Sequence, residues 1–237
     1  MSQTAHALNE PVTRSPRGAP ARQTARVAWC AWLAAACLAL GGCQKTYYSV
    51  LEKVGVEKRE ILSSRVERAK SSQEDAQKEF RDALEKFQAV TGHHGGELEQ
   101  RYEDLRDAYE RSQQQAHEVS DRIDAVENVA DALLDEWKQE LDRYEDASLR
   151  RRSAERRRAT ESEVQRLLRA MRRAEKSLDP VLRKLQDRVL YLKHNLNAAA
   201  LAGLDSQMPE LERDVAHLVS EMQASISEAD RFMAQVN

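Results

Sequence analysis

Apolar residues recur along most of this chain at alternating steps of four and three positions, a spacing that places them on one face of an α-helix. Four such apolar seams can be followed, from Leu62 to Val90, from Leu98 to Tyr144, from Val164 to Leu196 and from Leu211 to Val236. The positions between them are mostly polar or charged, as in helices that pack on one face and are solvated on the other. The pattern predicts an all-α fold, an elongated antiparallel coiled coil or long-helix bundle, over residues 61–237.

Helix-ending residues separate the seams. Three glycines fall within residues 91–96, where their backbone freedom suits a tight reversal. Asp179 and Pro180 interrupt the third seam, and we expect a short break there, with Asp179 capping a new helix that has proline in its first turn. Residues 203–209 form the last break. The second helix, expected over residues 97–146, would be about 75 Å long and would overhang its shorter neighbours.

The start of the chain has the charge order of an export signal. Four arginines precede an apolar run over residues 27–40, and no acidic residue lies between Glu10 and Cys43. The run has 14 residues, whereas a membrane-spanning helix needs about 20, so a retained anchor is the weaker alternative. It ends in Leu-Gly-Gly-Cys, which resembles the lipobox of bacterial lipoproteins. We expect residues 1–42 to be a cleaved signal peptide, Cys43 to be the lipidated N-terminus and residues 43–60 to be a tether.

Composition and motifs argue against an enzyme. Aromatic residues make up only 5% of the chain and charged residues 32%, so burial should be distributed along seams and not gathered around a deep pocket. No glycine-rich phosphate loop follows a strand, and no nucleophile lies near a histidine at a recognisable spacing. His93, His94 and Glu97 have zinc-ligand chemistry but no further ligand at a fixed spacing, so we expect solvated turn residues. We therefore expect no cofactor, no metal site and no small-molecule substrate.

A block of arginines is the most unusual local feature. It consists of Arg150, Arg151, Arg152, Arg156, Arg157 and Arg158. Residues 149–176 carry 11 basic and 4 acidic side chains, whereas residues 120–147 carry 3 basic and 10 acidic ones. If the chain reverses near residues 146–149, these segments lie side by side and their opposite charges favour antiparallel pairing. Internal pairing is our preferred interpretation, and the alternative is an anionic partner such as a membrane leaflet or a cell-envelope polymer.

Aromatic residues near both ends of the second helix are candidate partner contacts. Tyr102 and Tyr109 lie near one end, and Trp137 and Tyr144 lie near the other. An overhanging helix leaves a narrow apolar stripe that a further helix can cover, and aromatic side chains are enriched where interfaces concentrate their binding energy. We expect self-association or binding of an envelope protein at one of these ends. The mildly acidic chain that follows the signal gives no reason to expect nucleic acid as a partner.

Five segments recur in the order of a known family: YYSVLEKVG at residues 47–55, GGELE at 95–99, SLRR at 148–151, MRRAE at 171–175 and LKHNLNA at 192–198. In these segments the chain resembles a bacterial lipoprotein family known as domain of unknown function 2959. The resemblance implies a helical lipoprotein and brings no activity, substrate or catalytic residue.

The lipoprotein resemblance also implies a location. A residue other than aspartate after the lipidated cysteine, here Gln44, implies anchoring in the outer membrane on its periplasmic face. The sequence thus favours a lipid-anchored periplasmic scaffold or adaptor that acts by protein contacts. In the last of the five segments, His194, Asn195 and Asn197 interrupt an apolar seam, and we expect buried polar groups that fix helix register, with a partner contact as the alternative.

Overall fold

The computed structural model describes residues 58–92 and 98–236, and its helices belong to one compact unit that begins at Gly55. The elements are α3 (Lys58–Thr91), α4 (Leu98–Glu140), the 3₁₀ turn η1 (Leu141–Arg143), α5 (Ala147–Lys176), α6 (Leu178–His194), α7 (Ala198–Asp205) and α8 (Met208–Val236). No strand occurs among the described residues, so the all-α prediction is confirmed.

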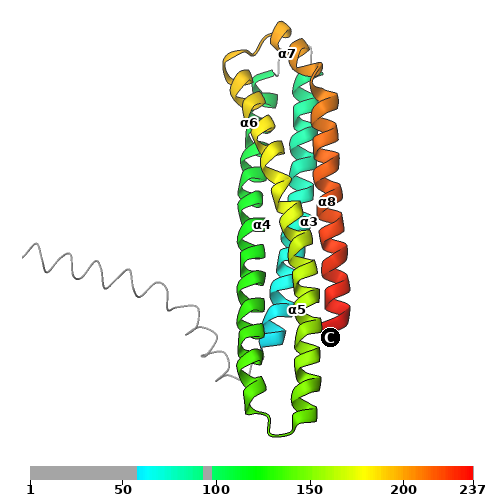
Figure 1. The fold of residues 1–237 in the computed structure, drawn as a ribbon. Helices are drawn as coiled ribbons and strands as arrows, with labels where there is room; N and C mark the ends of the chain where they lie inside the picture. Colours follow the sequence, from blue (N-terminus) through cyan, green and yellow to red (C-terminus); the bar gives the residue numbers. More distant parts are fainter. Residues whose placement is uncertain (1–57, 93–97, 237) are drawn as a thin grey trace, which may run out of the picture. The chain divides into compact units, whose positions relative to one another are not determined.

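The helices of this unit form four long rods. α3 and α4 pair as a hairpin, α5 and α6 follow each other as a third rod, and α8 packs against α3 and α5 (Figure 1). Two contacts fix the direction of α8: Lys70 Nζ lies 2.8 Å from Asp230 Oδ1, and Gln88 Nε2 donates to Glu212 Oε1 at 2.8 Å. The two contacts are the same number of residues apart on both helices, but their order is reversed: Lys70 precedes Gln88 in α3, whereas its partner Asp230 follows Glu212 in α8. The helical unit is therefore an elongated antiparallel bundle.

The predicted seams supply the core of the bundle. Phe80, Phe87 and Phe232 are almost fully buried, and each such side chain contributes roughly 1.5–3 kcal/mol by leaving water. α3 and α4 approach closely. The buried Ser112 of α4 shows this, since its hydroxyl donates a hydrogen bond to the backbone oxygen of Glu79 in α3 at 3.1 Å. The seams thus close on one another along most of the bundle.

The junction between α5 and α6 is a one-residue break, as expected. α5 ends at Lys176 and α6 begins at Leu178, so that Pro180 lies in the first turn of α6, where its missing N–H has no intrahelical partner to lose. The expected cap was wrong. Ser177 holds the N-cap position, and Asp179 lies inside the first turn with its carboxylate 3.0 Å from Arg183 Nη1.

The chain between α6 and α8 differs from the sequence expectation. His194 ends α6 and is exposed, Asn195 is its C-cap, and the exposed Asn197 accepts a hydrogen bond from Ala200 N at 3.1 Å as the N-cap of α7. These residues therefore end and begin helices, and the expectation that they are buried groups fixing register was wrong. Gly203 lies inside α7, so the last break comes only after this short helix.

Candidate functional site

One end of the bundle, formed by α4, η1 and the start of α5, lacks a buried core. No residue from 135 to 163 is buried, and the nearest buried side chains are Leu134 and Val164. α3 begins beside this end, because Lys58 Nζ lies 2.5 Å from Glu136 Oε2. Of the described helices, only α4 and α5 continue to the tip (Figure 1). We call residues 137–158 the hairpin end.

Local sequence chemistry builds the turn of the hairpin end. α4 gives way to η1 and then to the extended residue Tyr144, so the regular part of α4 is shorter than the expected helix. The Asp146 carboxylate accepts hydrogen bonds from Ser148 N at 2.7 Å and from Leu149 N at 3.0 Å, capping α5. These bonds hold the pKa of Asp146 below its usual range, with the Leu149 amide as the largest cause. The cap fixes where the chain reverses.

Cross-helix hydrogen bonds close the hairpin end without a core. Trp137 Nε1 donates to Ser153 Oγ at 2.8 Å, and Arg157 Nε donates to the backbone oxygen of Leu134 at 3.2 Å. Both bonds join α4 to α5. Polar contacts therefore replace the buried seam that holds the helices together elsewhere.

Apolar side chains of the hairpin end stay accessible. Tyr144 is 40% exposed and Leu149 is 45% exposed, while Trp137 and Leu141 are half-buried. α4 extends beyond α3 and α8 at the Trp137–Tyr144 end, one of the two ends expected as alternatives, but it is not unpaired, because α5 extends beside it. Leu149 belongs to none of the four apolar seams, so the spacing of apolar residues did not indicate that it would join the accessible apolar side chains of the hairpin end.

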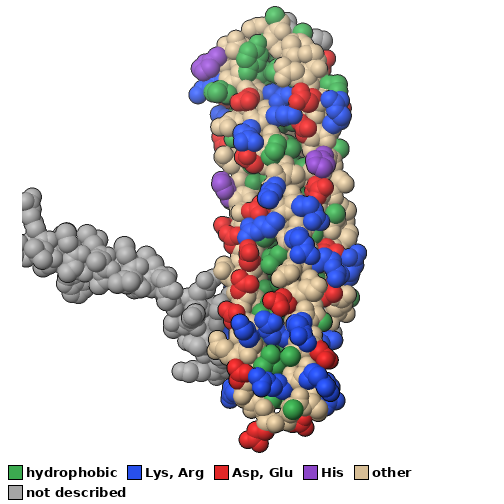
Figure 2. Space-filling model, in the orientation of Figure 1, with side chains coloured by type: hydrophobic (Ala, Val, Ile, Leu, Met, Phe, Trp, Pro, Cys, Tyr) green, Lys and Arg blue, Asp and Glu red, His purple; other side chains and the backbone are tan. Residues whose placement is uncertain are grey.

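The arginine block divides into two groups at the hairpin end. Arg150 Nη2 lies 2.6 Å from Asp142 Oδ1, and Arg157 Nη1 lies 3.0 Å from Glu161 Oε2 in the next turn. The other four are exposed and make no ion pair with any described residue; they are Arg151, Arg152, Arg156 and Arg158. Figure 2 shows basic side chains along the α5 face, with acidic ones gathered toward α4. Internal pairing accounts for only part of the block.

The main charge contact between α4 and α5 lies farther along the bundle, at Arg172. Its guanidinium contacts Asp124 at 2.6 Å and Glu127 in α4, and Glu175 in its own helix at 2.9 Å. Burial lowers the pKa of Arg172, but the hydrogen bonds to the three carboxylates outweigh it and raise the pKa above its usual range. The acidic and basic segments thus pair, as their charges predicted, chiefly through a residue outside the arginine block.

The other aromatic pair belongs to the interior. Tyr109 is only 8% exposed, and burial, followed by the charge of Glu110, raises the pKa of its hydroxyl. Tyr102 is half-buried. Since Tyr109 is part of the core, it is not free for a partner, and of the two alternative ends the Trp137–Tyr144 end keeps the accessible aromatic side chains.

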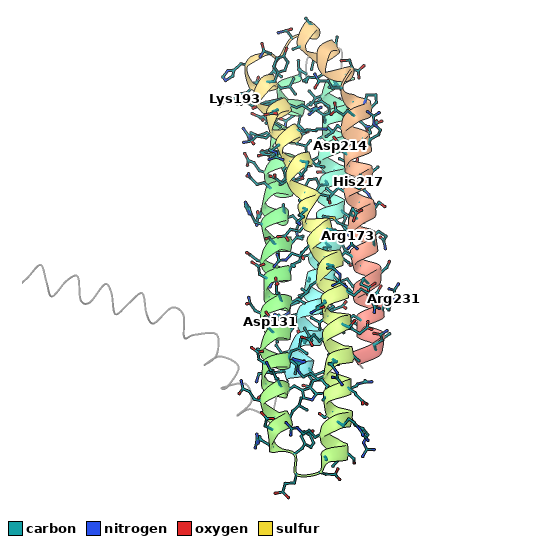
Figure 3. All side chains as sticks on the ribbon, viewed as in Figure 1. Asp131, Arg173, Lys193, Asp214, His217 and Arg231 are labelled. Carbon is teal, nitrogen blue, oxygen red and sulfur yellow. The ribbon has the colours of Figure 1, made fainter. Side chains whose placement is uncertain are left out.

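A hollow of about 370 Å³ lies where α5 meets α6 and faces α8. Arg173, Asp214 and His217 line it (Figure 3). Its charges are paired locally, because Lys184 contacts Asp214 and Arg173 Nε lies 3.9 Å from Glu221 Oε2. This hollow is explained by the bend between two helices.

Residues 58–92 and 98–236 contain neither a metal-binding cluster nor a membrane-spanning helix. No cluster of three or more histidine, cysteine or acidic side chains is placed to hold a metal ion in this part. None of the helices described here combines the length and the apolar character needed to cross a bilayer. Cys43, His93, His94 and Glu97 lie outside the described residues.

The described unit thus defines a class: all-α bundle proteins with exposed apolar and basic groups at one end. Residues 47–236 match the family described as "Protein of unknown function (DUF2959)", and the chain belongs to that family. Comparisons with curated proteins and with solved structures give no match. The family expected from the sequence is therefore confirmed, and its lipoprotein character stays a prediction.

Proposed function

We propose that this protein is a non-catalytic scaffold or adaptor, anchored by a lipid on Cys43 to the periplasmic face of the outer membrane, that binds a protein partner at the hairpin end. The observation that carries the proposal is the absence of buried residues from 135 to 163 in helices that remain regular. A helix pair with an open seam offers a further helix a place to pack.

The exposed arginines at the hairpin end are better explained by a role in binding a partner than by a role in stabilising the fold. α5 has no acidic residue in its first turn, and its early turns carry exposed arginines. Positive charge near a helix N-terminus is opposed by the helix dipole, so this placement disfavours α5 itself. Arg151, Arg152 and Arg156 gain no compensating ion pair from the described residues. A partner that brings negative charge would supply it.

These features specify the chemistry of the partner. The half-exposed Trp137, Tyr144 and Leu149 call for an apolar stripe, and the exposed arginines beside them call for acidic flanks. An amphipathic helix with an acidic border meets both requirements. Two desolvated aromatic anchors would concentrate the binding energy, while the arginines would select the partner and speed its approach.

Binding to an anionic surface is the second candidate function. The contact between Lys58 and Glu136 places the start of α3 beside the hairpin end. Residues 44–57, if fully extended, span at most about 50 Å, so under this proposal a lipid on Cys43 keeps the hairpin end near the membrane. Each basic residue close to an anionic leaflet contributes about 1 kcal/mol. The four exposed arginines would then contact lipid headgroups.

Site-specific photo-crosslinking in cells tests the proposal and separates its alternatives. A photoreactive amino acid is placed at Tyr144 or Leu149, and at the exposed Gln114 in the middle of α4 as a control. The proposal requires one protein to crosslink from both hairpin positions and not from Gln114, through a peptide with an acidic, amphipathic helical pattern. Crosslinks to lipid alone from both positions would favour surface binding, and no crosslink specific to the hairpin end would refute both.

A further inference from the structure

A charged residue occupies a core position of α6. Arg188 is only 6% exposed and lies three residues after the buried Leu185 and four before the buried Leu192, which is the spacing of the seam itself. Burying a guanidinium costs free energy unless a carboxylate and hydrogen bonds compensate it. The groups around Arg188 therefore decide whether this buried charge stabilises the fold or has another role, such as binding a ligand.

Those surroundings satisfy Arg188 only in part. Its Nη1 donates to the backbone oxygen of Lys184 at 2.8 Å, and its guanidinium carbon lies 5.7 Å from the centroid of the Phe87 ring. Its Nε is buried without a hydrogen-bond partner, and it makes no ion pair with a described carboxylate. The charge of Arg188 helps lower the pKa of Glu210, but less than Lys184, whose Nζ holds that carboxylate at 2.5 Å.

A cavity lies beside this arginine. It measures about 440 Å³, within the range of small-molecule sites, and is lined by Asp187, Arg188, Tyr191, Gly203, Leu204 and Gln207. Leu204 and Arg188 are buried and Tyr191 is 47% exposed, so the inner part of the cavity combines an apolar and a charged side chain and its rim is accessible. A Cβ added to Gly203 would meet no atom within 4 Å. The space beside α7 is therefore open.

We propose that this cavity binds a small zwitterion of the amino-acid class. The ligand's carboxylate would pair with Arg188, and its ammonium group with the exposed carboxylate of Asp187. One cation and one anion in the wall match a net-neutral ligand, and Asp187 disfavours a dianion such as phosphate. Tyr191 and Leu204 supply apolar contacts for its side chain. The sequence suggested no small-molecule substrate, and this ligand is bound without being converted.

Calorimetric titration of the full chain in detergent tests this site. The probes are alanine and leucine, with acetate and methylammonium as ligands that carry only one of the two charges. We expect both amino acids to bind, and acetate and methylammonium to bind at least about tenfold more weakly, because a charge-assisted pair is lost. Arg188→Gln should weaken leucine binding at least about tenfold, and Asp187→Asn should remove the preference of leucine over acetate. Arg183→Gln, on the exposed face of the same helix, is the matched control and should bind like the wild type.

Two further variants keep the test decisive if Arg188→Gln folds poorly. Gly203→Leu fills the open space beside α7 and should block leucine without unfolding the helix. Arg188→Met keeps the length of the stem and removes the buried charge, so it should raise the melting temperature while abolishing binding. Failure of both amino acids to bind at about 10 mM, or binding that survives Arg188→Met and Gly203→Leu, would overturn the proposal.

Discussion

The indole N–H of Trp137 in α4 donates to the hydroxyl of Ser153 in α5 at 2.8 Å, across a pair of helices that has no core at this point. The bond holds a large aromatic ring in place while leaving part of its surface accessible. A ring positioned in advance loses little conformational freedom on binding, so more of its buried area contributes to affinity. The same contact closes the hairpin end and, under the proposed function, positions the ring for a partner.

Removal of the aromatic side chains at the hairpin end should separate binding from stability. We expect Trp137→Ala combined with Tyr144→Ala to lower the free energy of unfolding by only about 1–2 kcal/mol, because one cross-helix hydrogen bond is lost but neither side chain is buried in the core. The same variant should lose the crosslinked partner. Denaturant unfolding of the full chain and partner recovery are the measurements.

Tyr109→Ala is the matched control, because this tyrosine is buried. It should lower the free energy of unfolding by about 3 kcal/mol or more through loss of core packing. If the hairpin variant is as unstable as Tyr109→Ala, or keeps its partner in full, the assignment of the hairpin end is wrong.

Charge reversal at the exposed arginines should leave the fold intact. Reversal to Glu is made at four positions together, Arg151, Arg152, Arg156 and Arg158. Since none of them forms an ion pair with a described residue, and since acidic residues are favoured near a helix N-terminus, the melting temperature should stay the same or rise. Partner crosslinking at Leu149 should fall, as should sedimentation with vesicles containing phosphatidylglycerol if the second candidate function holds.

Arg172→Ala is the comparison for this reversal. It removes the contacts to Asp124 and Glu127 that join α4 to α5, and we expect a loss of about 1 kcal/mol that shrinks at high salt. A clear loss of stability on reversing the exposed arginines, with none for Arg172→Ala, would show that the block itself holds the hairpin together.

The fold could be predicted because heptad spacing reports burial directly. Phe80 and Phe87 belong to the first apolar seam, and both are fully buried. The short helix α7 could not be predicted this way, because its eight residues are too few for a periodic pattern, and its cap, Asn197, looked like an interruption of the preceding seam.

The candidate sites were predictable only in part. Trp137 and Tyr144 were indicated by their seam spacing, but Ser153 becomes a neighbour of α4 only through the turn capped by Asp146. The site around Arg188 was missed, although an arginine at the correct spacing between Leu185 and Leu192 is a signal that sequence reasoning can use.

The buried amide in the core of α3 offers a test of packing. Gln73 is fully buried, and neither its Oε1 nor its Nε2 has a hydrogen-bond partner. Gln73→Leu should raise the free energy of unfolding by about 1–3 kcal/mol, because an unsatisfied polar group leaves the core and an apolar one of similar size replaces it. Gln114→Leu, at an exposed position of α4, is the control and should change it by less than about 0.5 kcal/mol. A destabilised Gln73→Leu protein would show that the amide has a partner in solution.

The Asp146 cap should make the hairpin end sensitive to acid. Its pKa is lowered in the folded protein, so the stabilisation is complete above the ordinary aspartate pKa of about 4 and is lost as the pH falls through the lower folded value. Asp146→Ala should therefore speed amide hydrogen exchange at Ser148 and Leu149 relative to the wild type at neutral pH, once rates are corrected for intrinsic exchange, and this difference should shrink as the carboxylate is protonated. Asp146→Asn keeps a side-chain acceptor for the same amides and should restore protection without the acid dependence.

Glu145→Ala is the matched control. It removes the neighbouring exposed carboxylate and should leave both amides protected. Equal exchange in the Asp146→Ala protein and the wild type at neutral pH would show that other contacts hold the turn. The hydrogen bond between Trp137 and Ser153 would then be the first of these contacts to remove by substitution.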